Sequence, residues 1–176
     1  MQSIRNSWSA SSGDADEIDR NGEVYASFKA KNIDLLSPKH NLAVFYASCT
    51  LNCLFCQNWH FRLKRPPGRV SAAHLSAQAH QRTFCICFFG GDPTPQMPHA
   101  LATSRLLARE GVTVCWETNG SMHPRFLDQA VDLSLKTGGC IKFDLKALDE
   151  NLHLALTGVP NRRTQENFRR AARRIP

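Results

Sequence analysis

Two kinds of hydrophobic pattern alternate along the chain. Short continuous apolar runs, typical of strands buried in a parallel sheet, occur at 41–46, 83–89, 112–116 and 140–144. Apolar residues at helical spacing follow these runs and predict helices at 71–80, 99–110, 124–136, 149–157 and 165–174. Ser71 is a suitable helix N-cap, and Gly111 is a suitable helix end. Repeated strand-then-helix units predict an α/β fold with parallel strands and right-handed crossovers.

Polar or glycine-containing segments follow each predicted strand. They are a cysteine-containing loop at 49–56, Gly-Gly-Asp at 90–92, Glu-Thr-Asn at 117–119, and Asp144 with Lys146. In folds of parallel β/α units the active site gathers at the carboxyl ends of the strands. We therefore expect these four segments to meet in one site.

The predicted core occupies residues 23–176, after a polar, serine-rich segment at 1–22 that we expect to be flexible and that lacks the apolar centre of a secretory signal. Only about four strands are visible, and an incomplete barrel leaves a sheet edge uncovered. We therefore expect a partial (β/α) barrel that is truncated at its C-terminus or covered by a partner.

The formal net charge is +7, and arginines near the end of the chain account for most of it. Such a cluster binds nucleic acid or an acidic partner in some proteins, but we interpret it as a solvated helix face because no RNA-binding signature accompanies it. No apolar run has the length needed to span a membrane. We expect neither a nucleic-acid nor a membrane partner.

The seven cysteines divide into two groups. Four of them lie in apolar contexts and are expected to be small core residues: Cys85, Cys87, Cys115 and Cys140. An odd number of cysteines in this pattern fits a reducing cytoplasm better than a secreted disulfide framework.

The other three cysteines, Cys49, Cys53 and Cys56, share one short loop. Their spacing allows three thiolates to bind three corners of one iron–sulfur cluster and to leave the fourth iron open for chemistry. A zinc site with His60 as fourth ligand is the structural alternative. Zinc does not explain the segments at the other strand ends, so we favour the cluster.

The cysteine spacing, with Phe55 before the third cysteine, resembles the signature of the radical S-adenosylmethionine (SAM) superfamily. Further blocks at 56–58, 88–93, 117–120 and 142–146 are similar to the activating enzymes of glycyl-radical enzymes, typified by the activase of pyruvate formate-lyase (formate C-acetyltransferase). The resemblance covers roughly residues 45–160. It implies that Cys49, Cys53 and Cys56 bind a 4Fe–4S cluster whose open iron chelates SAM.

The resemblance also implies the remaining cofactor-binding residues. Phe55 lies near adenine, Asn58 orders the loop or contacts SAM, and Lys146 lies near SAM. The segment Gly90, Gly91 and Asp92 meets the SAM amino group, although the family has Glu where this chain has the shorter Asp92. A monovalent cation is expected beside the SAM carboxylate, with oxygens from Glu117, which stands where Asp is usual, and from Thr118 and Asp144. Asn119 completes the predicted set as a turn residue at the cofactor site.

The resemblance predicts an oxidoreductase that reductively cleaves SAM to a 5′-deoxyadenosyl radical for hydrogen abstraction. The expected electron donor is ferredoxin or flavodoxin, and the expected substrate is a glycyl-radical protein. A radical SAM enzyme that modifies a small molecule or another peptide is the alternative within this class. A noncatalytic iron–sulfur or zinc protein is the hypothesis from a different class.

Overall fold

The computed structural model describes residues 2–6, 39–62 and 68–175. Its centre is a five-stranded sheet in the order β1-β2-β3-β4-β5. The strands are Gln2–Asn6, His40–Phe45, Thr83–Gly90, Thr113–Thr118 and Ile141–Phe143. β1 pairs antiparallel with β2, whereas β2 to β5 are parallel to their neighbours. The parallel strands therefore end at one common edge.

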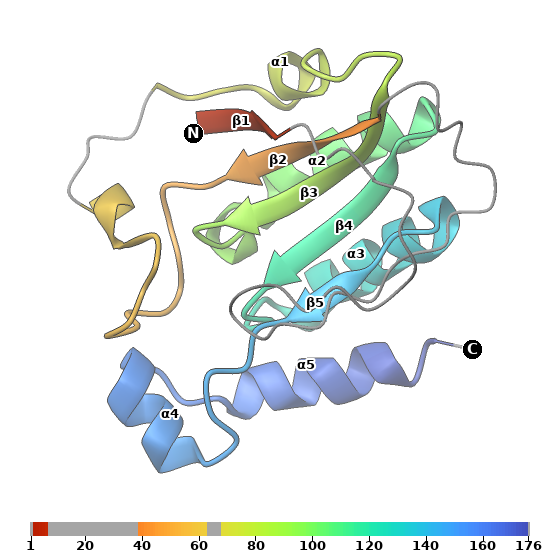
Figure 1. Cartoon of the computed structure of the whole chain (residues 1–176). Coiled ribbons are helices and arrows are strands. Elements are labelled where there is room, and N and C mark those ends of the chain that lie inside the picture. The colour runs from red at the N-terminus through yellow and green to blue at the C-terminus, as the bar shows by residue number, and fades with distance from the viewer. Residues whose placement is uncertain (1, 7–38, 63–67, 176) are drawn as a thin grey trace, which may run out of the picture.

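Helices connect the parallel strands and cover one face of the sheet, as Figure 1 shows for α2 and α3. The helices are α1 (Ala72–Ser76), α2 (Met97–Arg109), α3 (Pro124–Thr137), α4 (Glu150–Thr157) and α5 (Arg162–Ala172). Two short 3₁₀ turns are η1 (Trp59–Arg62) and η2 (Thr94–Gln96). In Figure 1, α4 lies beyond the carboxyl end of β5, and α5 runs back alongside β5. Within the described residues, no helix combines the length and apolarity needed to cross a bilayer.

The hydrophobic core lies between the sheet and the helices. Alternate residues of β3 and β4 point into it, and the rings of Phe88 and Trp116 stack at its centre with centroids 4.5 Å apart. From the helices, Leu101 and Leu127 are almost fully buried against these strands. The opposite face of the same strands carries the intervening residues and is only partly buried. This packing sets the positions of β3 and β4 relative to the helices and therefore the point at which each strand ends.

The predicted α/β fold with parallel strands is confirmed, and it is consistent with a partial radical SAM β/α fold. Ser71 caps α1 as predicted, because its hydroxyl accepts a hydrogen bond from His74 N, although α1 is shorter than the predicted 71–80. Residues 2–6 belong to the segment predicted to be flexible, and they form β1. Residues 7–38 lie outside the described residues, so the boundary at 22/23 stays a prediction.

The arginine-rich helix α5 is attached to α3 through charge pairs. Arg170 donates two hydrogen bonds of 2.7 Å to the carboxylate of Asp128, and Arg174 pairs with Asp132. Arg162 pairs with Glu166 on α5 itself. The predicted solvated helix face therefore also serves to orient α5.

Gly90 and Gly91 bring the end of β3 against the chain that leaves β2. A Cβ on Gly91, whose φ is 61°, would lie 1.9 Å from the carbonyl oxygen of Tyr46. A Cβ on Gly90 would overlap the ring of Phe45. The absent side chains allow Tyr46 N to donate to Gly90 O, and Asp92 N to donate to Ser48 O. This close approach holds the start of the cysteine loop against β3.

We predict that Gly91→Ala destabilises the fold more than Gly111→Ala does. Both glycines have positive φ, which costs an alanine about 1–2 kcal/mol. Only the Gly91 substitution also forces a Cβ into backbone, whereas a Cβ on Gly111 has nothing within 4 Å. Overpacking adds about 1–3 kcal/mol. Urea unfolding of both variants measures the difference, and equal losses would show that the contact at Gly91 relaxes freely.

Candidate functional site

The cysteine loop follows β2 at the carboxyl edge of the sheet and rests on α4. Asn52 N donates to Thr157 O at 2.8 Å, and Leu54 N donates to Leu156 O at 2.9 Å. Within the loop, Cys56 N donates to Cys53 O. The three predicted cluster cysteines are free thiols of intermediate exposure, so they are accessible from the edge where the parallel strands end.

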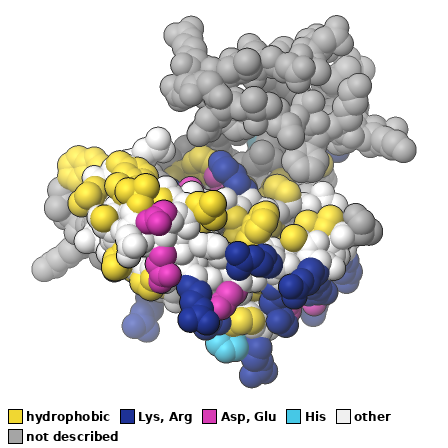
Figure 2. Space-filling view, turned by 90° about the horizontal axis from the view of Figure 1, so that it is seen from below, with side chains coloured by type: hydrophobic (Ala, Val, Ile, Leu, Met, Phe, Trp, Pro, Cys, Tyr) yellow, Lys and Arg dark blue, Asp and Glu magenta, His cyan; other side chains and the backbone are white. Residues whose placement is uncertain are grey.

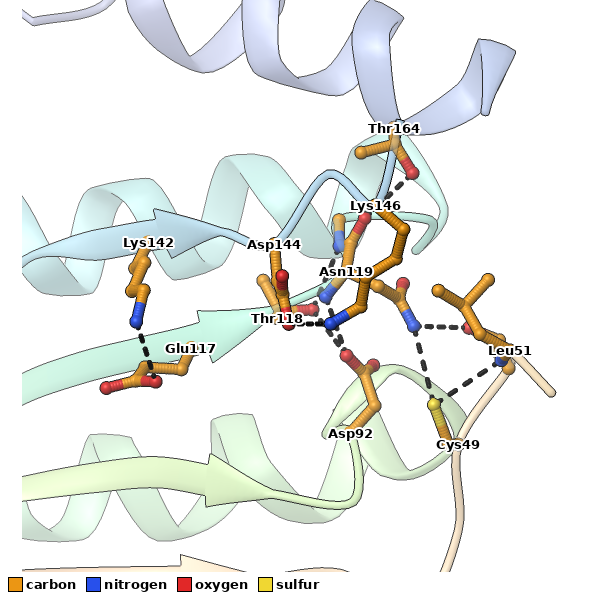
Figure 3. Close-up of polar contacts among 12 residues, drawn as sticks. Cys49, Leu51, Asp92, Glu117, Thr118, Asn119, Lys142, Asp144, Lys146 and Thr164 are labelled. Carbon is orange, nitrogen blue, oxygen red and sulfur yellow. Dashed lines mark hydrogen bonds and ion pairs between the residues drawn. The ribbon is translucent and has the colours of Figure 1, made fainter. Parts of the chain in front are cut away.

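Cys49 and Cys53 have different polar surroundings. The sulfur of Cys49 accepts hydrogen bonds from Leu51 N at 3.4 Å and from the Asn119 side-chain amide at 3.7 Å (Figure 3). Burial raises the pKa of the Cys49 thiol above its usual value, although the hydrogen bond from Leu51 opposes this. Burial also raises the pKa of Cys53, and the positive charge of Lys146 opposes it. Each thiol thus has a group that stabilises its thiolate.

Asp92 is buried at the end of β3, and its carboxylate points toward the end of β4 (Figure 3). It accepts hydrogen bonds from Thr94 N at 2.7 Å, Thr118 Oγ1 at 3.1 Å and Asn119 N at 2.8 Å. Burial raises the pKa of Asp92, although these hydrogen bonds favour the carboxylate. The Asp92 side chain therefore links the end of β3 to the end of β4. Its contact with SAM stays a prediction.

Lys146 connects the segment after β5 with the cysteine loop. Its ammonium pairs with the carboxylate of Asp144 and lies 5.7 Å from the centroid of the Phe55 ring. The Phe55 ring is 52% exposed, so one aromatic surface remains accessible beside this ion pair. The structure thereby brings together three of the residues predicted to bind the cofactor. Asn58 lies half-buried just after Cys56.

The oxygens predicted for a monovalent cation have other partners. Glu117 pairs with Lys142 at 3.5 Å on the partly buried face of the sheet, whereas the Thr118 hydroxyl donates to Asp92. Asp144 pairs with Lys146. Across residues 2–6, 39–62 and 68–175, no three His, Cys, Asp or Glu side chains are already arranged to hold a metal ion. The cation therefore has no support in this structure.

The four remaining cysteines were predicted to be core residues, and Cys85 is buried. Cys87, Cys115 and Cys140 are half-buried on the sheet face opposite the main core. Cys87 and Cys115 are direct register partners on β3 and β4. Burial, followed by the charge of Glu117, raises the pKa of Cys87. The pKa of Cys115 and that of Cys140 are raised as well.

Two polar residues of α5 complete the site and were not predicted. Thr164 Oγ1 donates to Asn119 O at 2.7 Å, and Asn167 donates to Gly120 O and Met122 O at 2.7 Å each. Both are almost fully buried. Together with Ala171 they occupy helical positions i, i+3 and i+7 among the arginines, and this spacing was the available signal.

Comparison with known proteins agrees with this arrangement. The profile of the radical SAM superfamily matches residues 43–176. The chain is 24% identical over 152 residues to the pyruvate formate-lyase 1-activating enzyme of Escherichia coli K12, covering 82% of this chain and 60% of that protein. It is 28% identical over 131 residues to the pyruvate formate-lyase-activating enzyme of Staphylococcus epidermidis, covering 67% of this chain and 51% of that one.

A third relative, an uncharacterized protein of Methanocaldococcus jannaschii, is 30% identical over 95 residues, covering 48% of this chain and 27% of that protein. The chain thus spans between about a quarter and three fifths of the lengths of these relatives. The parallel sheet and its connecting helices define an α/β protein built of β/α units. The chain belongs to the radical SAM superfamily.

The residues at the loop fit the iron–sulfur cluster that this superfamily implies. Thiolates are the usual ligands of such clusters, and the loop offers three free cysteines. Cys49 has two N–H donors, which is the kind of outer contact that stabilises a ligating sulfur. The buried hydroxyl of Ser48, next to Cys49, has no partner among the described residues. The donor chemistry therefore suits a cluster, although the three sulfurs are not gathered around one point in the described part of the chain.

We predict that Asp92→Asn destabilises the protein by about 1–3 kcal/mol. The amide nitrogen replaces an acceptor with a donor, so at least one buried N–H or O–H of Thr94, Thr118 or Asn119 loses its partner. Asp132→Asn is the control, because Asp132 is exposed and its pairing with Arg174 contributes less than about 1 kcal/mol. Urea unfolding measures both, and similar losses would contradict the prediction.

We predict that Cys87 reacts slowly with iodoacetamide in the native protein. Its pKa is raised, so at pH 8 it remains a neutral thiol, and each unit of increase lowers the reactive thiolate fraction about tenfold. Alkylation at pH 8, followed by peptide mass spectrometry, should be at least about tenfold slower in native than in urea-unfolded protein. The difference should shrink as the pH rises toward the native pKa. Equal rates at pH 8 would contradict it.

Proposed function

We propose that this protein is a radical SAM enzyme in which Cys49, Cys53 and Cys56 hold a 4Fe–4S cluster. When bound, the cluster and SAM supply one-electron cleavage of SAM to methionine and a 5′-deoxyadenosyl radical that abstracts a hydrogen atom. One observation carries the proposal: the end of β4 and the segment after β5 both reach the cysteine loop. Asn119 donates to Cys49, and Lys146 lies beside Cys53 and Phe55.

Residues around the loop are suited to hold SAM. We assign the carboxylate of SAM to Lys146 and its adenine to the exposed face of Phe55, because a cation and an aromatic surface stand side by side there. Asp92 uses its carboxylate on Thr94, Thr118 and Asn119. We therefore assign the SAM amino group to the backbone of 90–92 rather than to the Asp92 side chain.

A protein substrate fits the surroundings of this edge. Apolar side chains are exposed on the cysteine loop (Leu54, 81%), at the start of η1 (Trp59, 57%) and on the segment leading into α4 (Leu148, 75%). Figure 2, which views the molecule from below, shows hydrophobic side chains densest toward the left, and Lys and Arg mostly in the lower and right part of the view. Exposed apolar clusters mark protein-binding surfaces. With the activating-enzyme relatives, they favour a glycyl-radical protein as hydrogen donor.

The reductant that we propose is a ferredoxin or flavodoxin. The proposed location is the cytoplasm, because all seven cysteines are free thiols in this structure and a reducing compartment keeps them so.

Product analysis of the anaerobically reconstituted, dithionite-reduced protein tests the enzymatic proposal. We expect 5′-deoxyadenosine and methionine from SAM, detected by liquid chromatography with mass spectrometry. Cys53→Ser should lower product formation by about 100-fold or more, because it removes one cluster ligand. Cys87→Ser is the matched control, because Cys87 lies on the sheet and not in the loop, and it should retain the iron content. Full cluster occupancy without 5′-deoxyadenosine would contradict the proposal.

The proposed partner is tested separately by mixing the active protein with pyruvate formate-lyase. A glycyl radical in the electron paramagnetic resonance spectrum is the expected result. SAM cleavage without that signal would contradict this partner and leave the SAM chemistry in place.

A further inference from the structure

We propose that the side-chain amide of Asn119 sets the reduction potential of the cluster held by Cys49, by donating a hydrogen bond to the Cys49 sulfur. This inference rests on the proposed function, since it requires that Cys49 ligates a cluster. It assigns to Asn119 a positioning and tuning role in place of the turn residue predicted from the sequence.

The orientation of the Asn119 amide follows from its contacts. Its Oδ1 accepts a hydrogen bond of 2.9 Å from Ser121 N, so the oxygen must face that N–H. Its Nδ2 then faces two acceptors, Thr50 Oγ1 at 2.8 Å and Cys49 Sγ at 3.7 Å. The NH₂ group has two hydrogens, enough for both acceptors. The donor to the sulfur is therefore fixed by the network around it.

The backbone of Asn119 is held from two directions, as Figure 3 shows. Asn119 N donates to the Asp92 carboxylate at 2.8 Å, and Asn119 O accepts from Thr164 Oγ1 at 2.7 Å. Asp92, Asn119 and Thr164 are each at most 4% exposed. The backbone from which the amide projects is thus held by the β3 turn and by α5, neither of which belongs to the cysteine loop. This rigidity is what a residue that tunes a metal centre requires.

Hydrogen bonds to ligating sulfurs are one of the main determinants of the reduction potential of an iron–sulfur cluster. A reduced cluster carries one more negative charge, and part of it lies on the sulfurs. An N–H donor therefore stabilises the reduced form more than the oxidised form and raises the potential. Leu51 N gives Cys49 a second donor at 3.4 Å, but it belongs to the loop backbone. The Asn119 amide is the side-chain donor that a substitution can remove.

Potentiometric titration of the full chain with a reconstituted cluster tests the proposal. The signal is the electron paramagnetic resonance spectrum of the reduced cluster, measured without SAM. Asn119→Leu removes the donor at similar size, and we expect the equilibrium constant for reduction to fall about tenfold, which for one electron is about 59 mV. Asn119→Asp also removes the donor and adds a negative charge, so its potential should be lower still. Iron content and thermal unfolding are recorded for each variant.

Asn167→Ser is the matched control. It removes the hydrogen bonds from α5 to Gly120 O and Met122 O and so loosens the same turn, but Asn167 donates to these carbonyls and not to a cysteine sulfur. We expect its potential to equal that of the wild type. A shift in the control as large as that of Asn119→Leu would overturn the proposal, because the effect would then belong to the turn as a whole.

The wild-type protein provides a readout that needs no substitution. With asparagine labelled with nitrogen-15 in its side-chain amide, electron–nuclear double resonance of the reduced cluster should detect a nitrogen-15 coupling. The absence of that coupling would overturn the proposal, even if neither Asn119 variant folds. Unchanged potentials in Asn119 variants that hold a cluster would overturn it as well. Wild-type protein that holds no cluster would instead overturn the proposed function, and this inference with it.

Discussion

The arrangement of the site depends on one buried carboxylate. Asp92 follows β3 in a turn whose close contacts require glycine at positions 90 and 91. Its carboxylate oxygens accept hydrogen bonds from this turn and from the end of β4. Burial opposes its charge, so the carboxylate is tolerated only because these donors surround it. Through Asn119, the same carboxylate determines where the β4 turn lies relative to the first cysteine. The geometry of a loop on β2 is thus set by a contact between β3 and β4.

The sequence predicted the fold well because strand and helix periods report directly on burial. The apolar runs at 83–89 and 112–116 became β3 and β4, and the glycine or polar segments after them converge at one edge. Several of the predicted site residues lie around that edge, whereas Glu117 pairs with Lys142 on the sheet. That these residues bind a cofactor stays a prediction. Lys146 and Asp144, which share one short segment, lie beside Phe55, which comes from a segment far away in the sequence.

What the sequence could not provide was the direction of the side chains in these turns. Side chains along a strand alternate between the two faces of the sheet, but the direction of a turn side chain depends on its tertiary contacts. Asp92 therefore turns inward to β4, and Glu117 pairs with Lys142 on the neighbouring strand instead of joining Thr118. The sequence did not predict Thr164 and Asn167 as site residues, because arginines dominate their helix. These two polar residues are buried only because carbonyls of the turn after β4 accept their hydrogen bonds. Their helical spacing indicates a buried face of α5, but it does not encode the tertiary hydrogen bonds that this face makes.

The last turn of α4 has a further consequence for the cysteine loop. The final carbonyls of a helix have no donor within that helix, and here the loop supplies two of them, from Asn52 and Leu54. The loop thus pairs carbonyls of α4 that the Gly158 cap leaves free, and neither can open without exposing unpaired backbone groups of the other. We therefore expect the loop and the end of α4 to open as one cooperative unit. A partner that binds α4 would therefore also change how well ordered the cysteine loop is, without contacting a cysteine sulfur.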